Sequence, residues 1–247
     1  MVTTLSALAY LGLVLLLAGG PDIFKSLRDR PSLAPGLAGP LAGFLFLPTG
    51  GLPPFLDFAW SGSAFWLGLS LGPLGRMARG LKPRRAETLL QLFFLILAWL
   101  FLCFYALKRG LPGDLPGLSV FAATPLLAQA GPAAGPGLIC LFLALGPLAA
   151  RREADNRSDP ALLMSRFSIS AFLISVFFPF GLSGVFGEFL GWPLALSFDF
   201  FLFWGQVLLL NRVIAPRLDA ASRTRSGRTA LGIFAAAGLL LIIAEIF

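Results

Sequence analysis

Long apolar stretches, separated by short charged connections, make up most of this 247-residue sequence. Hydrophobic residues account for 57% of the chain and charged residues for 13%, whereas a soluble domain has about 25% charged residues. A helix that crosses the hydrocarbon core of a bilayer needs about 20 mostly apolar residues. The sequence therefore predicts an all-α, polytopic integral membrane protein with one transmembrane domain, residues 1–247. It excludes a soluble enzyme and a secreted disulfide scaffold.

The apolar stretches predict about eight transmembrane helices. The second stretch is short and is interrupted by proline and glycine, so hydropathy alone would favour a re-entrant segment there. The expected helices cover residues 2–18, 33–48, 58–75, 88–107, 133–150, 167–184, 190–210 and 229–247.

The placement of basic residues favours all eight helices. Of the 19 lysines and arginines, 17 lie in the odd-numbered connections and two in the fourth. Because cytoplasmic connections are enriched in lysine and arginine, this pattern places the odd connections in the cytoplasm and both termini on the outer side. Without the helix at 33–48, the first basic cluster would lie opposite the other three.

Residue types absent from the sequence limit its chemistry. The chain has no histidine, and Cys103 and Cys140 are isolated from each other. This excludes imidazole metal ligands, Ser-His or Cys-His catalysis and paired-cysteine motifs. We therefore expect no catalytic residue, metal or cofactor on this chain. No basic segment with interleaved aromatic residues indicates nucleic-acid binding.

Ionisable residues inside membrane spans are functional candidates because each is costly there. Asp199 lies in the middle of the seventh predicted helix, and Glu87 opens the fourth. Asp199 would belong to an ion pathway, or would bond to a neighbouring helix through Gln206 or Ser197. Glu87 is the second candidate for the ion pathway, or else an interfacial charge. Glu245, near the outer end of the last helix, is a weaker candidate.

The basic connections have two interpretations: signals of topology that also contact anionic lipid, or a surface for another protein. Residues 151–159 mix both charge signs, which favours ion pairing with a protein partner. The predicted docking residues are Arg28, Arg30, Arg151, Arg152, Asp155, Arg212 and Arg217.

Several segments, taken in order, resemble a known family. They are KSLRDRPSLAPGLAGP after the first helix, the pair Arg85 and Glu87, the loop ARREADNRSDPALLM followed by FFPFG, and LLLNRVIAPRLDAASRTRSGRTALG. Together they are similar to the eight-helix membrane subunit of respiratory complex I (subunit 1, NuoH type) and of energy-converting hydrogenases and formate hydrogenlyases (HycD type). The chain lacks some of that family's acidic positions, for example at Leu162, and so resembles a divergent member.

The resemblance implies a non-catalytic membrane-anchor subunit of a multi-subunit oxidoreductase in the bacterial inner membrane. Such a subunit docks hydrogenase-like large and small subunits and an iron–sulfur subunit, and it contacts antiporter-like membrane subunits. Iron–sulfur clusters and a nickel–iron centre would belong to the partners, whose electron transport drives proton translocation. A small transporter or channel with Asp199 in its path is the alternative. A lipid-modifying membrane enzyme ranks last, because the chain has no histidine or clustered aspartates.

Overall fold

The computed structural model describes residues 2–29, 34–49, 54–56, 61, 64–69, 96–97, 100–101, 103–104, 108, 126–150, 160–177 and 191–246, and these are almost entirely helical. The predicted helices at 58–75 and 88–107 lie largely outside these residues. The elements are α1 (Val2–Asp29), α2 (Ala34–Gly43), η2 (Phe44–Phe46), α6 (Leu126–Gln129), α7 (Ala134–Leu145), η3 (Gly146–Ala149), α9 (Pro160–Phe177), α11 (Trp192–Leu209), the π-turn η4 (Leu210–Ile214), α12 (Ala215–Ser222) and α13 (Arg225–Ile246).

Within the described residues, four helices are long and apolar enough to cross a membrane. They are Ser6–Asp29, Pro160–Phe177, Leu194–Ser222 and Arg225–Ile246. The segments Gly36–Phe46 and Ala134–Ala149 are apolar but shorter. The described chain is thus an all-α protein with several candidate membrane spans, while the count of eight stays a prediction.

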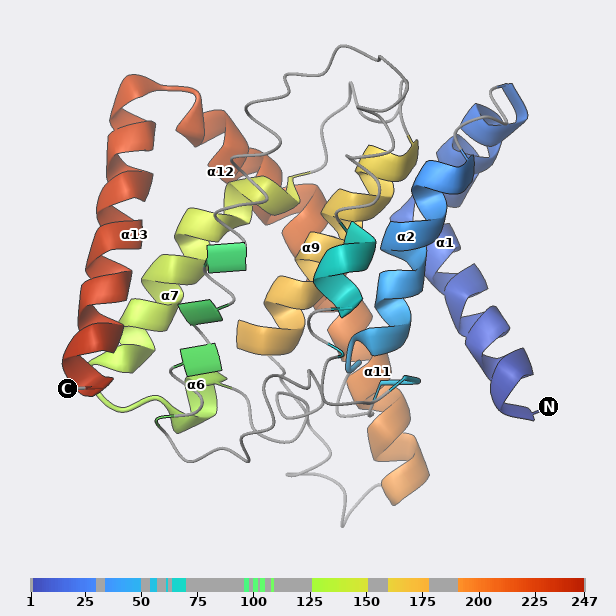
Figure 1. The fold of residues 1–247 in the computed structure, drawn as a ribbon, viewed down its shortest axis with the longest axis horizontal. Coiled ribbons are helices and arrows are strands. Elements are labelled where there is room, and N and C mark those ends of the chain that lie inside the picture. The colour runs from blue at the N-terminus through green and yellow to red at the C-terminus, as the bar shows by residue number, and fades with distance from the viewer. Residues whose placement is uncertain are drawn as a thin grey trace.

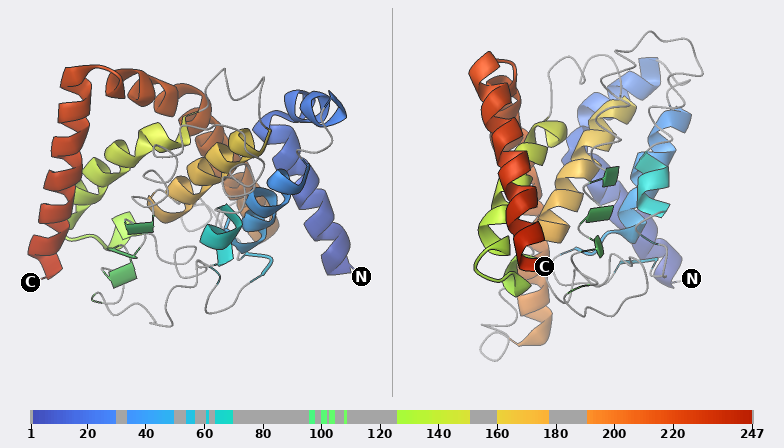
Figure 2. Two further views of the ribbon diagram at one scale, coloured as in Figure 1. Left: turned by 45° about the horizontal axis from the view of Figure 1, so that its top comes forward. Right: turned by 60° about the vertical axis from the view of Figure 1, so that its left-hand side comes forward.

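The described helices alternate in direction (Figures 1 and 2). Helices α1, α7 and α11 start at the end of the bundle where the N and C termini lie, and α2, α9 and α13 run back toward it. We call this the terminal end. The opposite end, where α1 and η3 finish and α2, α9 and α13 begin, is the basic end, because these described elements adjoin the first, fifth and seventh connections, which are rich in arginine and lysine.

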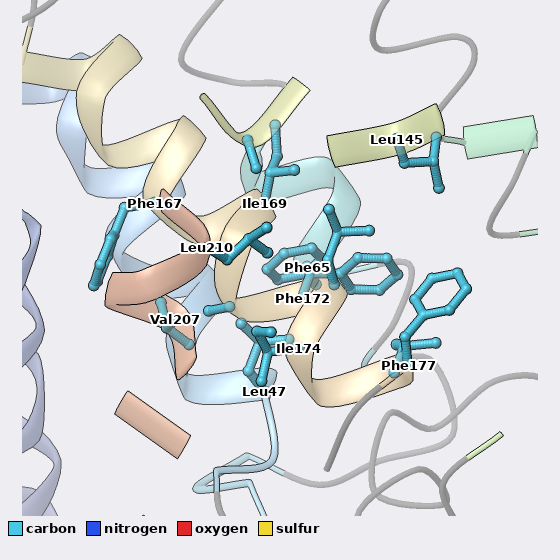
Figure 3. Packing of buried hydrophobic residues seen from close by; sticks show 14 of the residues in the cluster. Leu47, Phe65, Leu145, Phe167, Ile169, Phe172, Ile174, Phe177, Val207 and Leu210 are labelled. Atoms are coloured by element: carbon cyan, nitrogen blue, oxygen red, sulfur yellow. The ribbon is translucent and has the colours of Figure 1, made fainter. Parts of the chain in front are cut away.

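Helix α9 forms the centre of the bundle. Of its residues, 94% are buried, and α1, α2, α7 and α11 all pack against it. Its aromatic rings anchor the core: Phe167 stacks on Trp204 with ring centroids 5.9 Å apart, and Phe172 stacks on Phe65 at 5.4 Å. Figure 3 shows Phe65, Phe172 and Phe177 in this cluster.

Helices α7 and α13 pack side by side at the edge of the bundle, through glycine (Figure 1). A Cβ atom at Gly137 would lie 2.9 Å from the Gly238 carbonyl oxygen, and one at Gly238 would lie 2.7 Å from that of Gly137. Small residues permit such close backbone approach between membrane helices. The pair therefore depends on these two glycines.

Two long helices are interrupted. Helix α1 consists of two helical parts joined by a kink at Gly19, whose φ of 129° is not helical, so the first part ends near the predicted limit at residue 18 and the second part, with Pro21 near its start, runs to Asp29. Helix α11 passes through the π-turn η4 into α12, beyond the predicted limit at residue 210. Pro216 has no N–H that could donate to the carbonyl oxygen of Arg212. The π-turn is wider than an α-helical turn, and in it Ala215 N–H donates to Leu210 O, so the chain stays helical on both sides of the turn.

Candidate functional site

Asp199, the strongest predicted ion-pathway residue, is fully buried. It lies on α11, and none of its side chain is exposed. Helix α11 carries exposed Phe198 and Phe201 on its outer side and packs against α9 on its inner side. A carboxyl group in this position faces the interior of the bundle and not the lipid, as is usual for ionisable residues in membrane spans.

Arg212, a predicted docking residue, bonds to the backbone of α1. Its Nη2 atom donates to the carbonyl oxygen of Leu17 at 3.2 Å. Leu17 lies just before the kink at Gly19 and four residues before Pro21, which has no N–H, so this carbonyl lacks a helical donor. The side chain remains exposed at the basic end, and a guanidinium has five N–H groups. Arg212 therefore closes the break in α1 and keeps donors for other groups.

A buried polar cluster next to Arg212 in the sequence joins η3, α9 and η4. Asn211 Nδ2 donates to Ala149 O at 2.9 Å and to Ser170 Oγ at 3.0 Å. Ser170 Oγ in turn donates to Arg166 O at 3.0 Å. The cluster ties the end of η3 to α9 and to the π-turn η4. Because buried polar groups are costly when unbonded, it fixes how these elements meet.

Arg166 is a buried arginine on α9. Only 6% of it is exposed, and its Nη1 atom donates to Leu148 O at 3.2 Å. A buried guanidinium needs polar partners, so this bond helps to hold the start of α9 against η3. Sequence reasoning treated Arg166 as the edge of a connection and started the helix at residue 167, whereas α9 begins at Pro160.

The connection from α12 to α13 exposes several arginines at the basic end. Arg217, another predicted docking residue, is exposed on α12. Asp219 is buried and its Oδ2 atom lies 2.7 Å from Arg223 Nη2, an i,i+4 ion pair. Arg217, Arg225 and Arg228 form no ion pair with the residues that the structure describes.

Arg28 lies at the end of α1, exposed, with its Nε atom 3.6 Å from Asp29 Oδ1. Both side chains are largely in solvent, so the pair adds little stability. Arg28, Arg212 and Arg217 thus all lie exposed on elements of the basic end, as a docking surface requires. The remaining predicted residues, Glu87, Arg30, Arg151, Arg152 and Asp155, lie outside the described residues.

Glu245 has a structural role at the terminal end. Its Oε1 atom accepts from Gly131 N–H at 2.9 Å and its Oε2 atom from Ala134 N–H at 2.6 Å. Ala134 is the first residue of α7 and Gly131 lies in the turn that leads into it, where backbone N–H groups lack helical acceptors and the helix dipole favours negative charge. A residue at the end of α13 therefore caps α7.

Sequence reasoning missed Arg166 and Asn211. The signal for Asn211 was its position directly after the apolar run VLLL and five residues before Pro216, in a stretch that was predicted to leave the membrane. Arg166 had no comparable signal, because its acceptor, Leu148 O, is a backbone atom.

The described residues contain no group of three or more histidine, cysteine, aspartate or glutamate side chains placed to hold a metal ion. Comparisons with protein-family models, with curated proteins and with solved structures found no match.

Proposed function

We propose that this chain is the membrane-anchor subunit of a multi-subunit redox complex of the complex I or energy-converting hydrogenase kind. One observation supports the proposal most: the described helix ends that adjoin the basic connections all lie at one end of the bundle. In a bilayer this end would be cytoplasmic, since it carries most of the positive charge. An acidic peripheral arm would bind there.

The rigidity of the basic end also favours a docking role. Asn211 connects η3, α9 and η4 through buried hydrogen bonds, and Arg212 connects η4 to α1. A docking surface on elements fixed in this way loses little conformational freedom on binding. The partners that we propose are hydrogenase-like large and small subunits and an iron–sulfur subunit, with antiporter-like subunits beside the bundle, in a bacterial inner membrane.

The test reverses charge in the predicted docking loop. Arg151→Glu with Arg152→Glu should release the peripheral chains that co-purify with the tagged protein at low salt, as identified by mass spectrometry. Lys108→Glu with Arg109→Glu is the matched control, because these residues lie in the even connection predicted on the other side. Retention of the partners by the loop variant, or their equal loss from both variants, would refute docking at residues 151–152.

A second candidate function is a small transporter or channel, and the complete burial of Asp199 favours it. The purified chain alone would then move protons or sodium ions across liposomes. Asp199→Asn should slow that flux, and Glu245→Gln, which alters a carboxylate used for capping, should not. A chain that needs its partners for any ion flux would contradict the transporter.

A further inference from the structure

We infer that the connection between α12 and α13 binds acidic phospholipid through a surface formed by Arg217, Arg223, Arg225 and Arg228, which we call the arginine corner. Residues 215–228 contain these four arginines and one acid, Asp219, so the connection has a net charge of +3. All four arginines are exposed. The inference goes beyond the proposed docking of a peripheral arm.

The arginine corner contains one ion pair of its own. Asp219 is buried and pairs with Arg223. In the part of the chain that the structure describes, Arg217, Arg225 and Arg228 form no ion pair. The basic end of α1 differs: Lys25 and Arg28 are accompanied by Asp22 and Asp29, which makes that segment neutral overall. Among the described parts of the basic end, the arginine corner therefore attracts anions most strongly.

The surroundings of the corner favour lipid over a protein partner. Ile233 on α13 is 61% exposed and Phe234 is 40% exposed. Ile233 follows Arg228 by five residues, or about 7.5 Å along a helix. On the other side of the corner, Val213 is exposed ahead of α12. Exposed apolar side chains thus lie within one or two helical turns of these arginines, as expected for a surface that contacts lipid.

The spacing of the arginines suits a phosphate group. Arg225 and Arg228 are three residues apart on the first turn of α13 and so share one face of the helix. Guanidinium groups bind phosphate oxygens with two parallel N–H bonds. We therefore expect phosphatidylglycerol or a similar acidic phospholipid to bind at this face, and zwitterionic phosphatidylcholine to bind much more weakly.

The test titrates the purified full-length chain in detergent with phosphatidylglycerol and, separately, with phosphatidylcholine, and follows bound lipid by native mass spectrometry. Arg225→Gln with Arg228→Gln should weaken phosphatidylglycerol binding by about fivefold per arginine, since each basic side chain near an anionic surface contributes about that factor. Phosphatidylcholine binding should not change. These two residues are outside the proposed docking set, so failure here would leave the proposed function standing.

Two further variants complete the test. Lys25→Gln with Arg28→Gln removes the same charge from the neutral segment of α1 and should leave phosphatidylglycerol binding nearly unchanged. Arg225→Lys with Arg228→Lys retains the charge but loses the paired N–H bonds, so it should lose less binding than the Gln pair, which separates charge loss from misfolding. Unchanged binding in the Gln pair at the corner, an equal loss in the α1 pair, or loss of co-purifying protein without loss of lipid would each overturn the inference.

Discussion

Arg212 and Leu17, 195 residues apart in sequence, are joined by a hydrogen bond from the guanidinium Nη2 atom to the main-chain carbonyl oxygen, 3.2 Å long. Each residue lies four positions before a proline, Pro216 and Pro21 respectively. Neither proline has an N–H to donate, and both helices are interrupted nearby, α1 by the kink at Gly19 and α11 by the π-turn. The arginine crosses between the two interruptions and bonds to the carbonyl that Pro21 leaves without a donor.

Removal of this bond should loosen α1. We expect Arg212→Ala to lower the free energy of unfolding by about 1–2 kcal/mol, because a hydrogen bond from a charged donor is lost at an exposed site. Arg212→Lys keeps a charged donor and should lose less. The measurement is unfolding in mixed micelles, with Arg217→Ala as the control, since Arg217 is exposed without an ion pair to the described residues. Equal stability of the Arg212→Ala and Arg217→Ala variants would show that the bond contributes nothing.

The contact between α7 and α13 should tolerate no side chain at its centre. Gly238→Ala places a methyl group 2.7 Å from the Gly137 carbonyl oxygen, so the backbones must separate. We expect a loss of about 1–3 kcal/mol. Gly232→Ala is the matched control, since a Cβ there meets nothing within 4 Å, and alanine is the better helix former by about 1 kcal/mol. A loss of stability in Gly238→Ala together with a gain in Gly232→Ala would support the close packing of α7 and α13. An equal change in the stability of both variants would contradict it.

The cap by Glu245 should protect the start of α7. Glu245→Ala removes both acceptors for Gly131 and Ala134, and we expect a loss of about 1 kcal/mol, typical of a lost helix cap. Glu245→Gln retains one acceptor and should lose less. Hydrogen exchange measures the effect directly: peptides that cover residues 131–136 should exchange faster in the alanine variant, while those from α9 should not change. Unchanged exchange at residues 131–136 would exclude the cap.

Asn211 should matter more than the serines that bond within their own helix. Asn211→Leu keeps the volume but leaves Ala149 O without this donor, and we expect a loss of about 1–3 kcal/mol. Ser165 donates to Ala161 O in the same helix, so Ser165→Ala should have a smaller effect. Both variants are measured by unfolding in the same micelles. If Asn211→Leu and Ser165→Ala had the same free energy of unfolding, the buried cluster around Asn211 would make no special contribution to stability.

The sequence predicts the helical character of the chain and the approximate place of each described long helix, because apolar length alone indicates a membrane span. It places helix ends less well. The start of α9 was set after Arg166 on the assumption that an arginine marks a connection, yet the structure buries Arg166 against Leu148 O. A partner that is a backbone atom in a distant segment leaves no mark in the sequence.

The break in α11 was interpreted as a helix end for a similar reason, whereas the kink at Gly19 does end the first helical part of α1. Gly19, Pro21 and Pro216 are residues that usually end a helix. Here the π-turn lets the helix continue although Pro216 has no N–H, and Arg212 supplies a donor for the carbonyl oxygen of Leu17. From charge alone, the sequence identified four described residues of the candidate site: Asp199 for the ion pathway, and Arg28, Arg212 and Arg217 for docking. It gave no indication that Arg212 would bond to α1, because that contact depends on the fold.

Cysteine accessibility in membranes tests the central claim most directly, namely that the basic connections lie together on the cytoplasmic side. Single cysteines at Asp29, Asp155, Thr224 and Pro132 are introduced into a chain in which Cys103 and Cys140 are replaced, and are labelled with an impermeant maleimide in sealed vesicles of known orientation. We predict that positions 29, 155 and 224 react from the cytoplasmic side and position 132 from the outer side. Labelling of positions 155 and 224 from opposite sides would contradict the common basic end and the docking function proposed for it.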